Sequence, residues 1–312
     1  MHRIAIIIPY FGKWPSWFAL FLDSCYHNPT IDFYFFTDCD TSTYALKDKS
    51  NVFLYKISFE EYCKIVSKKL EIDFHPDNAY KLCDLKPFYG LVHSDILMNY
   101  DFWGFGDIDL IWGNLRSYYT DDMLGRCDVI SNHSDRVSGH LSLIRNNERM
   151  NNLIFSIPNW KQQLQSEQHY AIDEIAFTKK LYPAAVIMWK VHRHIIFRLP
   201  FINEFKSHVR FCTLFNRVMM PRRICFKERY TTPWFNESDF SNIEIANKNR
   251  WIWKDGHIYD LHHKKELPYL HFLGMKKYWP TDCYHLTYPY TDVIINLNGI
   301  YNAEVFSNNT TI

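Results

Sequence analysis

The sequence lacks paired cysteines, a long apolar run and a marked excess of charge of either sign. None of its eight cysteines lies in a Cys-x-x-Cys pair, so neither a zinc motif nor a disulfide framework is indicated. No uninterrupted apolar run reaches the roughly 18 residues that a membrane-spanning helix needs. The formal net charge is +1, which argues against a general role in binding polyanions, nucleic acid included.

The start of the sequence offers no targeting segment. Its first apolar stretch, residues 4–8, stops at Pro9 and is too short for the apolar core of a signal peptide. Unpaired thiols fit a reducing compartment. We therefore expect a cytoplasmic protein.

Apolar and aromatic side chains are abundant. The chain has 312 residues, 47% of them hydrophobic and 18% aromatic, which is enough to bury a large core. Within the first hundred residues, apolar strands alternate with helices. Strands are expected at 4–8, 31–36 and 52–55, and helices at 14–25 and 59–70. Ser58 and Glu61 can form a capping box at the start of the second helix. This order predicts a doubly wound, mostly parallel α/β sheet, which binds ligands beyond the carboxyl ends of its strands.

Residues 102–113 hold two acids, Asp107 and Asp109, inside a strongly apolar stretch. Strand alternation would put both on one face of an extended segment, near its exposed end. Ionised carboxylates are almost never buried without a partner, so this pair needs a cation. Oxygen ligands at this spacing suit Mg²⁺ or Mn²⁺, with substrate phosphates completing the coordination. The alternative is that both acids cap turns at the end of the strand.

A helix expected at residues 79–92 carries Lys81, Asp84 and Lys86, and Pro87 marks a kink or a break in it. Two interpretations stay open. In the first, Lys81 and Asp84 form a solvated ion pair that contributes little stability. In the second, Lys81 or Lys86 lies near a phosphate and Asp84 holds it in place.

The middle of the chain continues the alternation. Further strands are expected at 127–131 and 140–144, and helices at 146–157, 159–167 and from 172 onward. Asp173 and Glu174 stand at the start of the last of these helices, where the helix dipole favours acidic side chains. Capping is therefore the simplest explanation of this pair.

Residues 190–229 form a basic, amphipathic stretch. Ten Lys or Arg residues there face only Glu204 and Glu228, and aromatic and aliphatic residues lie between them. Such a stretch could lie on an anionic membrane surface or bind a lipid-linked diphosphate. It could equally be a helical insertion that packs on the core with snorkelling basic side chains.

Residues 267–280 combine His271, Gly274, Lys276 and Lys277. Neutral imidazole ligates Mn²⁺ beside carboxylates. Glycine lets the backbone approach a phosphate closely. Lysine supplies a point charge for a diphosphate leaving group. A lone histidine of this kind can equally be a core or surface residue.

Residues 271–279 resemble the His-aromatic-x-Gly-x-x-Lys-Pro-Trp signature of glycogenin-like and lipopolysaccharide galactosyltransferase-like enzymes, with Tyr278 in place of the proline. Asp107-Ile108-Asp109 resembles their Asp-x-Asp metal motif. Residues 138–144 are similar to their small-residue strand beside the donor sugar, and residues 173–174 stand where these enzymes carry an Asp-Gln pair. The layout is also similar to that of a group of bacterial polysaccharide-biosynthesis glycosyltransferases.

The resemblance implies a GT-A fold, a Rossmann-like, mostly parallel sheet flanked by helices. It covers residues 1 to about 185 and 265 to 280. The expected organisation is a nucleotide-sugar-binding core at 1–189, a basic insertion at 190–230, and a C-terminal segment at 231–312. That last segment would return residues 271–277 to the active site.

The resemblance also implies roles for individual residues. The metal ligands would be Asp107, Asp109 and His271. Asp173 or Glu174 would contact the sugar or the acceptor. The donor would be bound by residues from several loops: Pro9, Tyr10, Phe11, Asp38, Lys81, Asp84, Lys86, Asp107, Gly139, His140, Ser142, Gly274 and Lys277, with Lys276 as a second candidate for the role of Lys277.

The implied activity is metal-dependent transfer of a galactose- or glucose-type hexose from a nucleotide diphosphate, with uridine as the usual base. The acceptor would be a glycan or a lipid-linked oligosaccharide in bacterial capsule, O-antigen or lipopolysaccharide synthesis, at the inner face of the cytoplasmic membrane if the basic stretch binds there. The resemblance also implies that the transfer retains the configuration of the anomeric carbon. In an inverting enzyme, Asp173 or Glu174 would be the base.

Two other classes remain as alternatives. A nucleotidyltransferase also pairs acids with a metal, but the loop after the first strand, residues 9–12, is a poor phosphate cradle. A carbohydrate-binding protein without catalysis would use the abundant Trp and Tyr residues for sugar stacking.

Overall fold

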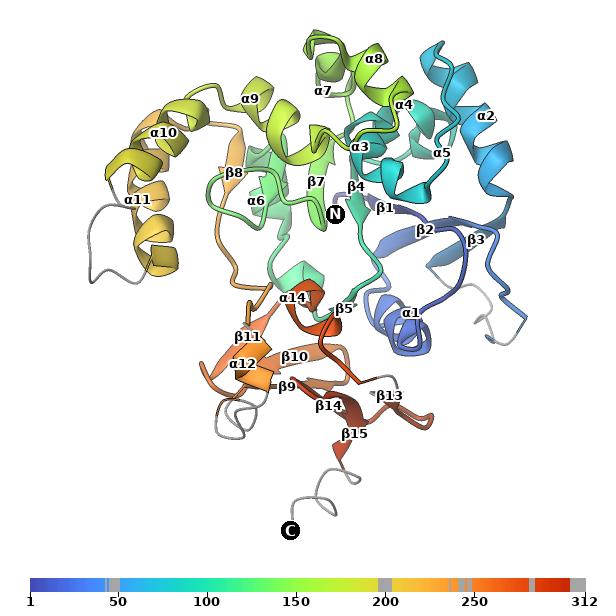
Figure 1. Cartoon of the computed structure of the whole chain (residues 1–312), viewed down its shortest axis with the longest axis vertical. Coiled ribbons are helices and arrows are strands. Elements are labelled where there is room, and N and C mark those ends of the chain that lie inside the picture. Colours follow the sequence, from blue (N-terminus) through green and yellow to red (C-terminus); the bar gives the residue numbers. More distant parts are fainter. Residues whose placement is uncertain are drawn as a thin grey trace.

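The computed structural model describes residues 1–42, 44, 51–195, 204–235, 237–240, 245, 249–280 and 284–303. At its centre lies a seven-stranded sheet with the strand order β3-β2-β1-β4-β7-β6-β8 (Figure 1). Its strands are β1 (Ile4–Pro9), β2 (Ile31–Thr37), β3 (Val52–Lys56), β4 (Phe102–Gly106), β6 (Val129–Ser131), β7 (Leu141–Arg145) and β8 (Ile224–Phe226).

Every strand of this sheet except β7 runs in the same direction. β3, β2, β1 and β4 pair in parallel, and so do β6 and β8. β7 is antiparallel to both of its neighbours, β4 and β6. The expected mixed, mostly parallel α/β fold is therefore confirmed.

Both faces of the sheet are buried, as the continuous apolar run of β1 predicts. Ile4, Ile6 and Ile8 point into one core together with α1 (Phe18–Tyr26) and the C-terminal part of the chain. Ala5 and Ile7 point into a second core on the other face, which includes the buried side chains of α2 (Phe59–Leu70). The sequence prediction of α2 is confirmed in detail, because Ser58 and Glu61 form a capping box at its start.

The remaining helices are mostly short. On the N-terminal side of β4 they are η1 (Ala79–Lys81), α3 (Leu82–Leu85), η2 (Lys86–Phe88), α4 (Tyr89–Val92) and α5 (Ser94–Leu97). Later ones are η3 (Leu115–Ser117), α6 (Asp121–Arg126), α7 (Glu148–Asn151), η4 (Asn152–Ser156), α8 (Trp160–Gln165), η5 (Ile172–Ala176), α9 (Phe177–Leu181), α10 (Ala185–Ile195), α11 (Glu204–Met219), α12 (Glu237–Phe240) and α14 (Leu273–Lys276).

Two predicted helices are interrupted in the structure. The helix expected at 79–92 is divided into 3₁₀ and α turns, and Pro87 lies in the 3₁₀ turn η2, as its missing N–H and its ring would require. The helix expected at 146–157 divides into α7 and the 3₁₀ turn η4, and the one from 172 begins with the π-helical turn η5. The sequence indicated only the break at Pro87; the division of 146–157 and the π-helical turn at 172 were not visible in the apolar periodicity.

A second sheet, which the sequence analysis did not predict, forms the C-terminal part (Figure 1). Its strand order is β11-β10-β9-β14-β15-β13. The strands are β9 (Arg250–Lys254), β10 (His257–Asp260), β11 (Lys265–Leu267), β13 (Tyr284–His285), β14 (Asp292–Asn296) and β15 (Gly299–Asn302). A separate pair, β5 (Leu110–Trp112) and β12 (Tyr269–His271), joins the two halves of the molecule in antiparallel register.

The basic stretch at 190–229 contributes to the core sheet. Its residues 196–203 lie outside the described part, and the rest holds the end of α10, all of α11, and β8, which pairs with β6 at the edge of the sheet. α10 begins at Ala185, before the expected boundary at residue 190. Among the described residues, no helix combines the length and the apolar character that crossing a bilayer requires.

Candidate active site

The chain bends between β4 and β5, and this bend carries both acids. Residues 107–109 are not strand residues, so the expectation of one extended segment with both acids on one face is wrong. The bend arises because β4 belongs to the main sheet whereas β5 leaves it to pair with β12. The backbone N–H of Asp107 donates to the carbonyl oxygen of His140 at 3.1 Å, which fixes the bend against the start of β7.

The β5–β12 pair brings His271 opposite Leu110, directly after Asp109. One ligand atom each from Asp107, Asp109 and His271 lies within 4.8 Å of the other two. Asp109 and His271 are buried, with 5% and 3% of their surface exposed, and Asp107 is half-buried. Two segments that lie far apart in the sequence thus meet at one point, as the sequence analysis expected.

The imidazole of His271 is held at one nitrogen and faces the two carboxylates with the other. Its Nδ1 lies 2.9 Å from the hydroxyl of Thr232. Its Nε2 is buried, lies 3.4 Å from Asp109 Oδ2, and makes no hydrogen bond of good geometry to any group in the described part of the chain. If Nδ1–H donates to Thr232, Nε2 presents a lone pair toward the two carboxylates. This donor set of two carboxylates and one imidazole fits Mn²⁺ or Mg²⁺.

Two lysines neutralise the acids in this structure. Lys86 Nζ donates to Asp107 Oδ1 at 2.5 Å and to the carbonyl oxygen of Gly139 at 2.7 Å. Lys276 Nζ lies 2.8 Å from Asp109 Oδ2. Burial alone would raise the pKa of Asp109, but His271 and Lys276 outweigh it and hold this pKa below its usual range. Burial alone would lower the pKa of Lys86, but the carboxylate of Asp107 outweighs it and raises this pKa.

The cluster lies in the wall of a cavity of about 740 Å³. Its volume suits a bound small molecule of drug or cofactor size. Twelve of the residues that the sequence analysis selected line this cavity: Pro9, Tyr10, Phe11, Lys86, Asp107, Asp109, Gly139, His140, Asp173, Glu174, His271 and Lys276.

The other selected residues do not line the cavity: Asp38, Lys81, Asp84, Ser142, Gly274 and Lys277. Asp38 accepts a hydrogen bond from the backbone N–H of Gly12 at 2.7 Å and so holds the loop after β1. Ser142 is buried and donates to the carbonyl oxygen of Ser138 at 3.0 Å. Lys277 is exposed, with its ammonium 4.5 Å from the ring centroid of Tyr278, whereas Lys276 lines the cavity.

Lys81 and Asp84 form a buried ion pair at 2.9 Å, with side-chain exposures of 2% and 0%. The interpretation as a solvated pair is therefore wrong. Lys81 also donates to the carbonyl oxygens of Gln163 and Gln168, and Asp84 accepts from the backbone N–H of Tyr170 and of Ile172. Through these hydrogen bonds, the pair holds η1 and α3 against residues 163–172, which precede Asp173 and Glu174.

Asp173 and Glu174 lie in the π-helical turn η5 and face Gly139. A Cβ atom at Gly139 would lie 2.8 Å from Asp173 Oδ2 and 3.1 Å from Glu174 Oε1, so a glycine is needed for this close approach. Burial, supported by the charges of Glu174 and Asp107 and opposed by Lys86, raises the pKa of Asp173 to about 7. The simple capping explanation does not account for this environment.

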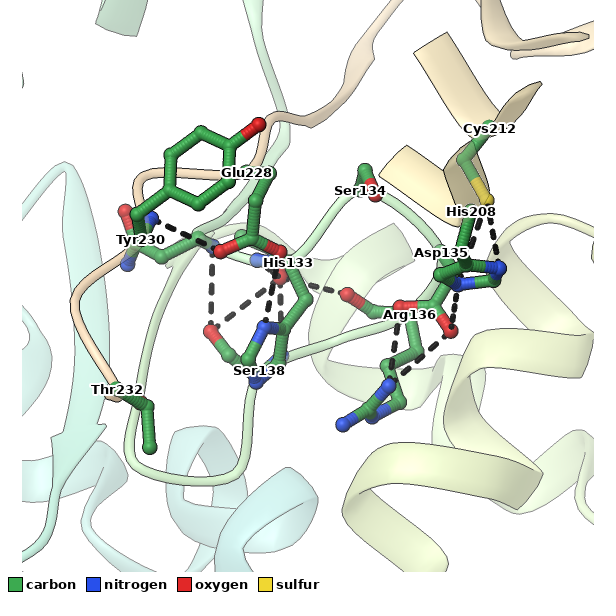
Figure 2. A network of polar contacts seen from close by, with 12 residues as sticks. His133, Ser134, Asp135, Arg136, Ser138, His208, Cys212, Glu228, Tyr230 and Thr232 are labelled. Carbon is green, nitrogen blue, oxygen red and sulfur yellow. Dashed lines mark hydrogen bonds and ion pairs between the residues drawn. The ribbon is translucent and has the colours of Figure 1, made fainter. Parts of the chain in front are cut away.

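Several cavity residues were missed by the sequence analysis: Tyr80, His133, Arg136, His169, Thr232 and Trp234. Arg136 donates from Nε to Glu174 at 3.3 Å and from Nη1 to Asp135 at 3.0 Å. His133 lies 3.4 Å from Glu228. Figure 2 shows that Asp135 and His208 join the loop of residues 132–138 to α11, and that His133 and Glu228 join it to the segment that carries Thr232. No local pattern marks them, because their positions depend on how distant segments pack.

The chain matches one family model and is similar to several solved structures. A family model described as "Family of unknown function (DUF6625)" matches residues 6–302. No curated protein matches the chain.

Similar solved structures include mouse xyloside xylosyltransferase 1 in its apo form, with a TM-score of 0.35 and 10% identity over 60% of this chain and 82% of that one. The PaToxG glycosyltransferase has a TM-score of 0.33 and 12% identity over 70% and 87% of the two chains. An active-site mutant of LgtC has a TM-score of 0.39 and 10% identity over 91% and 92%.

Proposed function

We propose that this chain, which belongs to the family DUF6625, is a metal-dependent glycosyltransferase that uses a nucleotide diphosphate sugar. The observation that carries the proposal is the cluster of Asp107, Asp109 and His271 in the wall of a cavity. Two carboxylates and an imidazole with an unpaired Nε2 form a site for one divalent cation. The resemblance of residues 107–109 and 271–279 to glycosyltransferase motifs points to the same chemistry.

Asp107, Asp109 and His271 would hold Mn²⁺ or Mg²⁺. A bound divalent cation offsets the negative charge that builds up on a diphosphate leaving group. Thr232 keeps the imidazole in the orientation that points Nε2 at the carboxylates. Lys276, whose ammonium already lies beside Asp109, adds a second positive charge on that side of the cavity.

The charges that line the cavity favour an anionic ligand only when a cation is bound. The lining residues include three basic side chains, Lys86, Arg136 and Lys276, and four acidic ones, Asp107, Asp109, Asp173 and Glu174. When Asp173 is ionised, the protein alone therefore has one more acid than bases in this wall. A divalent cation reverses the balance, which suits the anionic diphosphate of a nucleotide sugar.

The sugar would lie against Gly139, Asp173 and Glu174, where the carboxylates accept hydrogen bonds from hydroxyl groups. The donor we propose is a UDP-linked hexose of the galactose or glucose type, and the acceptor a glycan or lipid-linked oligosaccharide of a bacterial surface polysaccharide. We propose retention of configuration, as the resemblance implies. An inverting enzyme is favoured instead if Asp173, with its raised pKa, takes the proton of the acceptor hydroxyl.

The experiment that tests the proposal is a donor-hydrolysis screen. Purified protein is incubated with UDP-galactose, UDP-glucose and other nucleotide sugars, each with Mn²⁺, Mg²⁺ or a chelator, and nucleotide release is measured. We expect release from at least one donor only in the presence of metal. A thermal-shift measurement with UDP and Mn²⁺ accompanies it, because a carbohydrate-binding protein without a donor site would gain no metal-dependent stability from UDP. No release with any donor and no such stabilisation would reject the proposal.

A further inference from the structure

One face of α11 combines exposed apolar and basic side chains. α11 stands at the β8 edge of the molecule, next to α10 (Figure 1). Its outward residues are Lys206, Arg210, Leu214, Arg217 and Val218, and these five define what we call the docking face. Leu214 and Val218 expose 61% and 81% of their surface. Such exposure is unusual for two neighbouring aliphatic residues on one helix.

The spacing of these residues makes the docking face continuous. Lys206, Arg210, Leu214 and Val218 follow one another at intervals of four, so they form one stripe along the helix, and Arg217 lies beside it. The opposite side of α11 packs into the protein through Val209 and Cys212, which are buried. The docking face is therefore not the side by which the helix is held in the fold.

After Glu204 at its start, α11 carries charged side chains of one sign only. No Asp or Glu occurs between residues 205 and 227 in the sequence. Met219, the last residue of the helix, and Arg222 and Arg223 beyond it are also exposed and extend the same combination of apolar and basic side chains. Arg223 reaches the buried carboxylate of Asp128, whereas no ion pair to an acid of the described chain holds Arg210 or Arg217.

We propose that the docking face of α11 binds the surface of an anionic lipid bilayer. Basic side chains beside exposed aliphatic ones are the composition of helices that lie in a membrane interface, where the aliphatic groups enter the acyl boundary and the cations meet lipid phosphates. An acidic protein partner would satisfy the arginines but would leave Leu214 and Val218 without apolar contacts. A second copy of the chain would bring like charges together.

The docking face is fixed relative to the cavity by contacts on the inner side of α11, of which Figure 2 shows the one between His208 and Asp135. On the inner side of α11, His208 Nε2 lies 3.3 Å from Asp135, and Asn216 donates to the carbonyl oxygen of Ser134 at 2.7 Å. The same loop holds Arg136, which reaches Glu174 in the cavity wall. A membrane-bound protein would therefore hold its cavity at a defined position relative to the lipid surface.

The test is co-flotation of the full chain with vesicles, without nucleotide or acceptor, so its outcome does not depend on the transferase proposal. One set of vesicles is pure phosphatidylcholine, and the other contains one third phosphatidylglycerol. We expect binding to the anionic vesicles that decreases with added salt. The variants Arg210→Gln/Arg217→Gln and Leu214→Gln/Val218→Gln should each lower the partition coefficient about tenfold. All four positions are exposed, so both variants should fold normally.

A matched control is Lys64→Gln/Lys68→Gln, which removes two exposed charges from α2 and should bind like the wild type. No binding to anionic vesicles, or equal binding to neutral ones, would overturn the proposal. A loss of binding in the α2 control as large as in the α11 charge variant would also overturn it, because the effect would then be one of net charge. Self-association in ultracentrifugation that Leu214→Gln/Val218→Gln abolishes would assign the face to a second copy instead.

Discussion

His271 Nε2 lies 3.4 Å from Asp109 Oδ2, across the short antiparallel pair of β5 and β12. The two residues are adjacent only because of this pairing, since β5 follows the main sheet and β12 belongs to the C-terminal part. Backbone hydrogen bonds therefore set the distance between imidazole and carboxylate. His271 lies in β12, and Asp109 directly precedes β5 with its carbonyl oxygen accepting from the N–H of Phe272 at 3.1 Å. Such backbone pairing holds side chains more rigidly than a free loop would, and the following predictions depend on that rigidity.

Replacing Asp109 by Asn keeps the shape of the side chain but removes its charge. We expect the metal-dependent stabilisation by UDP to disappear, which for the wild type at a hundredfold excess over Kd is about 2.7 kcal/mol. Thermal denaturation with UDP and Mn²⁺ measures it. Asp122→Asn, an exposed residue of α6, is the control and should retain the full stabilisation. Metal-dependent transfer at the wild-type rate in Asp109→Asn would reject the metal assignment.

Replacing Thr232 by Ala removes the hydroxyl that orients His271. Mutating a group that orients a metal ligand typically lowers the metal affinity by about 10- to 100-fold. We therefore expect the Thr232→Ala variant to bind Mn²⁺ about tenfold more weakly than the wild type. Titration calorimetry with Mn²⁺ measures this. Thr232→Ser restores the hydroxyl and should restore the affinity. An unchanged Mn²⁺ affinity in the alanine variant would mean that Thr232 does not position the imidazole.

Lys276 and Lys277 are neighbours with different surroundings. Lys276 lines the cavity beside Asp109, whereas Lys277 is exposed outside it. We expect Lys276→Gln to weaken the binding of UDP with Mn²⁺ about tenfold, through the loss of one charge beside the diphosphate. Lys277→Gln should change it less than twofold. Calorimetry measures both affinities. A larger loss of UDP affinity in Lys277→Gln than in Lys276→Gln would show that Lys277, not Lys276, contacts the diphosphate.

Asp173 should make stability depend on pH in the metal-free protein. Burial raises its pKa to about 7, while an unfolded aspartate titrates near 3.9. Between these values the folded state binds more protons than the unfolded state, so the free energy of unfolding falls as pH rises from about 4 to about 7 and then levels off. At about 1.4 kcal/mol per pH unit the decrease is a few kcal/mol.

Urea denaturation at pH 5 and pH 8 in the presence of a chelator measures this dependence. Asp173→Asn removes the titrating group, so this part of the pH dependence should disappear, and the variant should be the more stable protein at pH 8. Identical pH dependence in the wild type and in Asp173→Asn would show that the carboxyl of Asp173 titrates at its usual pKa.

Gly274 makes room for the segment that carries Trp234. A Cβ atom at Gly274 would lie 2.7 Å from the backbone oxygen of Pro233 and 3.3 Å from the ring of Trp234. We expect Gly274→Ala to destabilise the protein by about 1–3 kcal/mol, because backbone must move. Gly125→Ala is the control: it lies in helix α6 with no atom within 4 Å of its Cβ, so it should be neutral or stabilising by up to about 1 kcal/mol. Equal effects in urea denaturation would contradict this account.

The parts of the fold that local signals encode were predictable. The buried run of β1 and the capping box of Ser58 and Glu61 lie within a few residues of one another in the sequence, and both predictions are confirmed. The C-terminal sheet was not predicted, although one signal was present. Asp255-Gly256, both with positive φ, forms the two-residue turn between β9 and β10, and Asp-Gly between strand-like segments favours such a hairpin.

The site was predictable only where a motif carried it. Asp107, Asp109 and His271 were identified through their spacing and the resemblance of their surroundings, and the structure brings them together. Arg136 and Thr232 belong to no such motif, since each acts on a residue that is distant in sequence. The ion pair of Lys81 and Asp84 was visible, but its burial depends on segments 163–172, so spacing could not distinguish a surface pair from a buried one.

The pairing of β5 with β12 also determines when during synthesis the site becomes complete. A growing chain that has left the ribosome up to β5 already carries both carboxylates, but the imidazole is still untranslated. Lys86, which pairs with Asp107, has been synthesised by then, whereas the partners of Asp109, His271 and Lys276, have not. A prematurely terminated product could therefore fold much of its main sheet and still lack the third ligand, and metal binding would distinguish finished chains from unfinished ones.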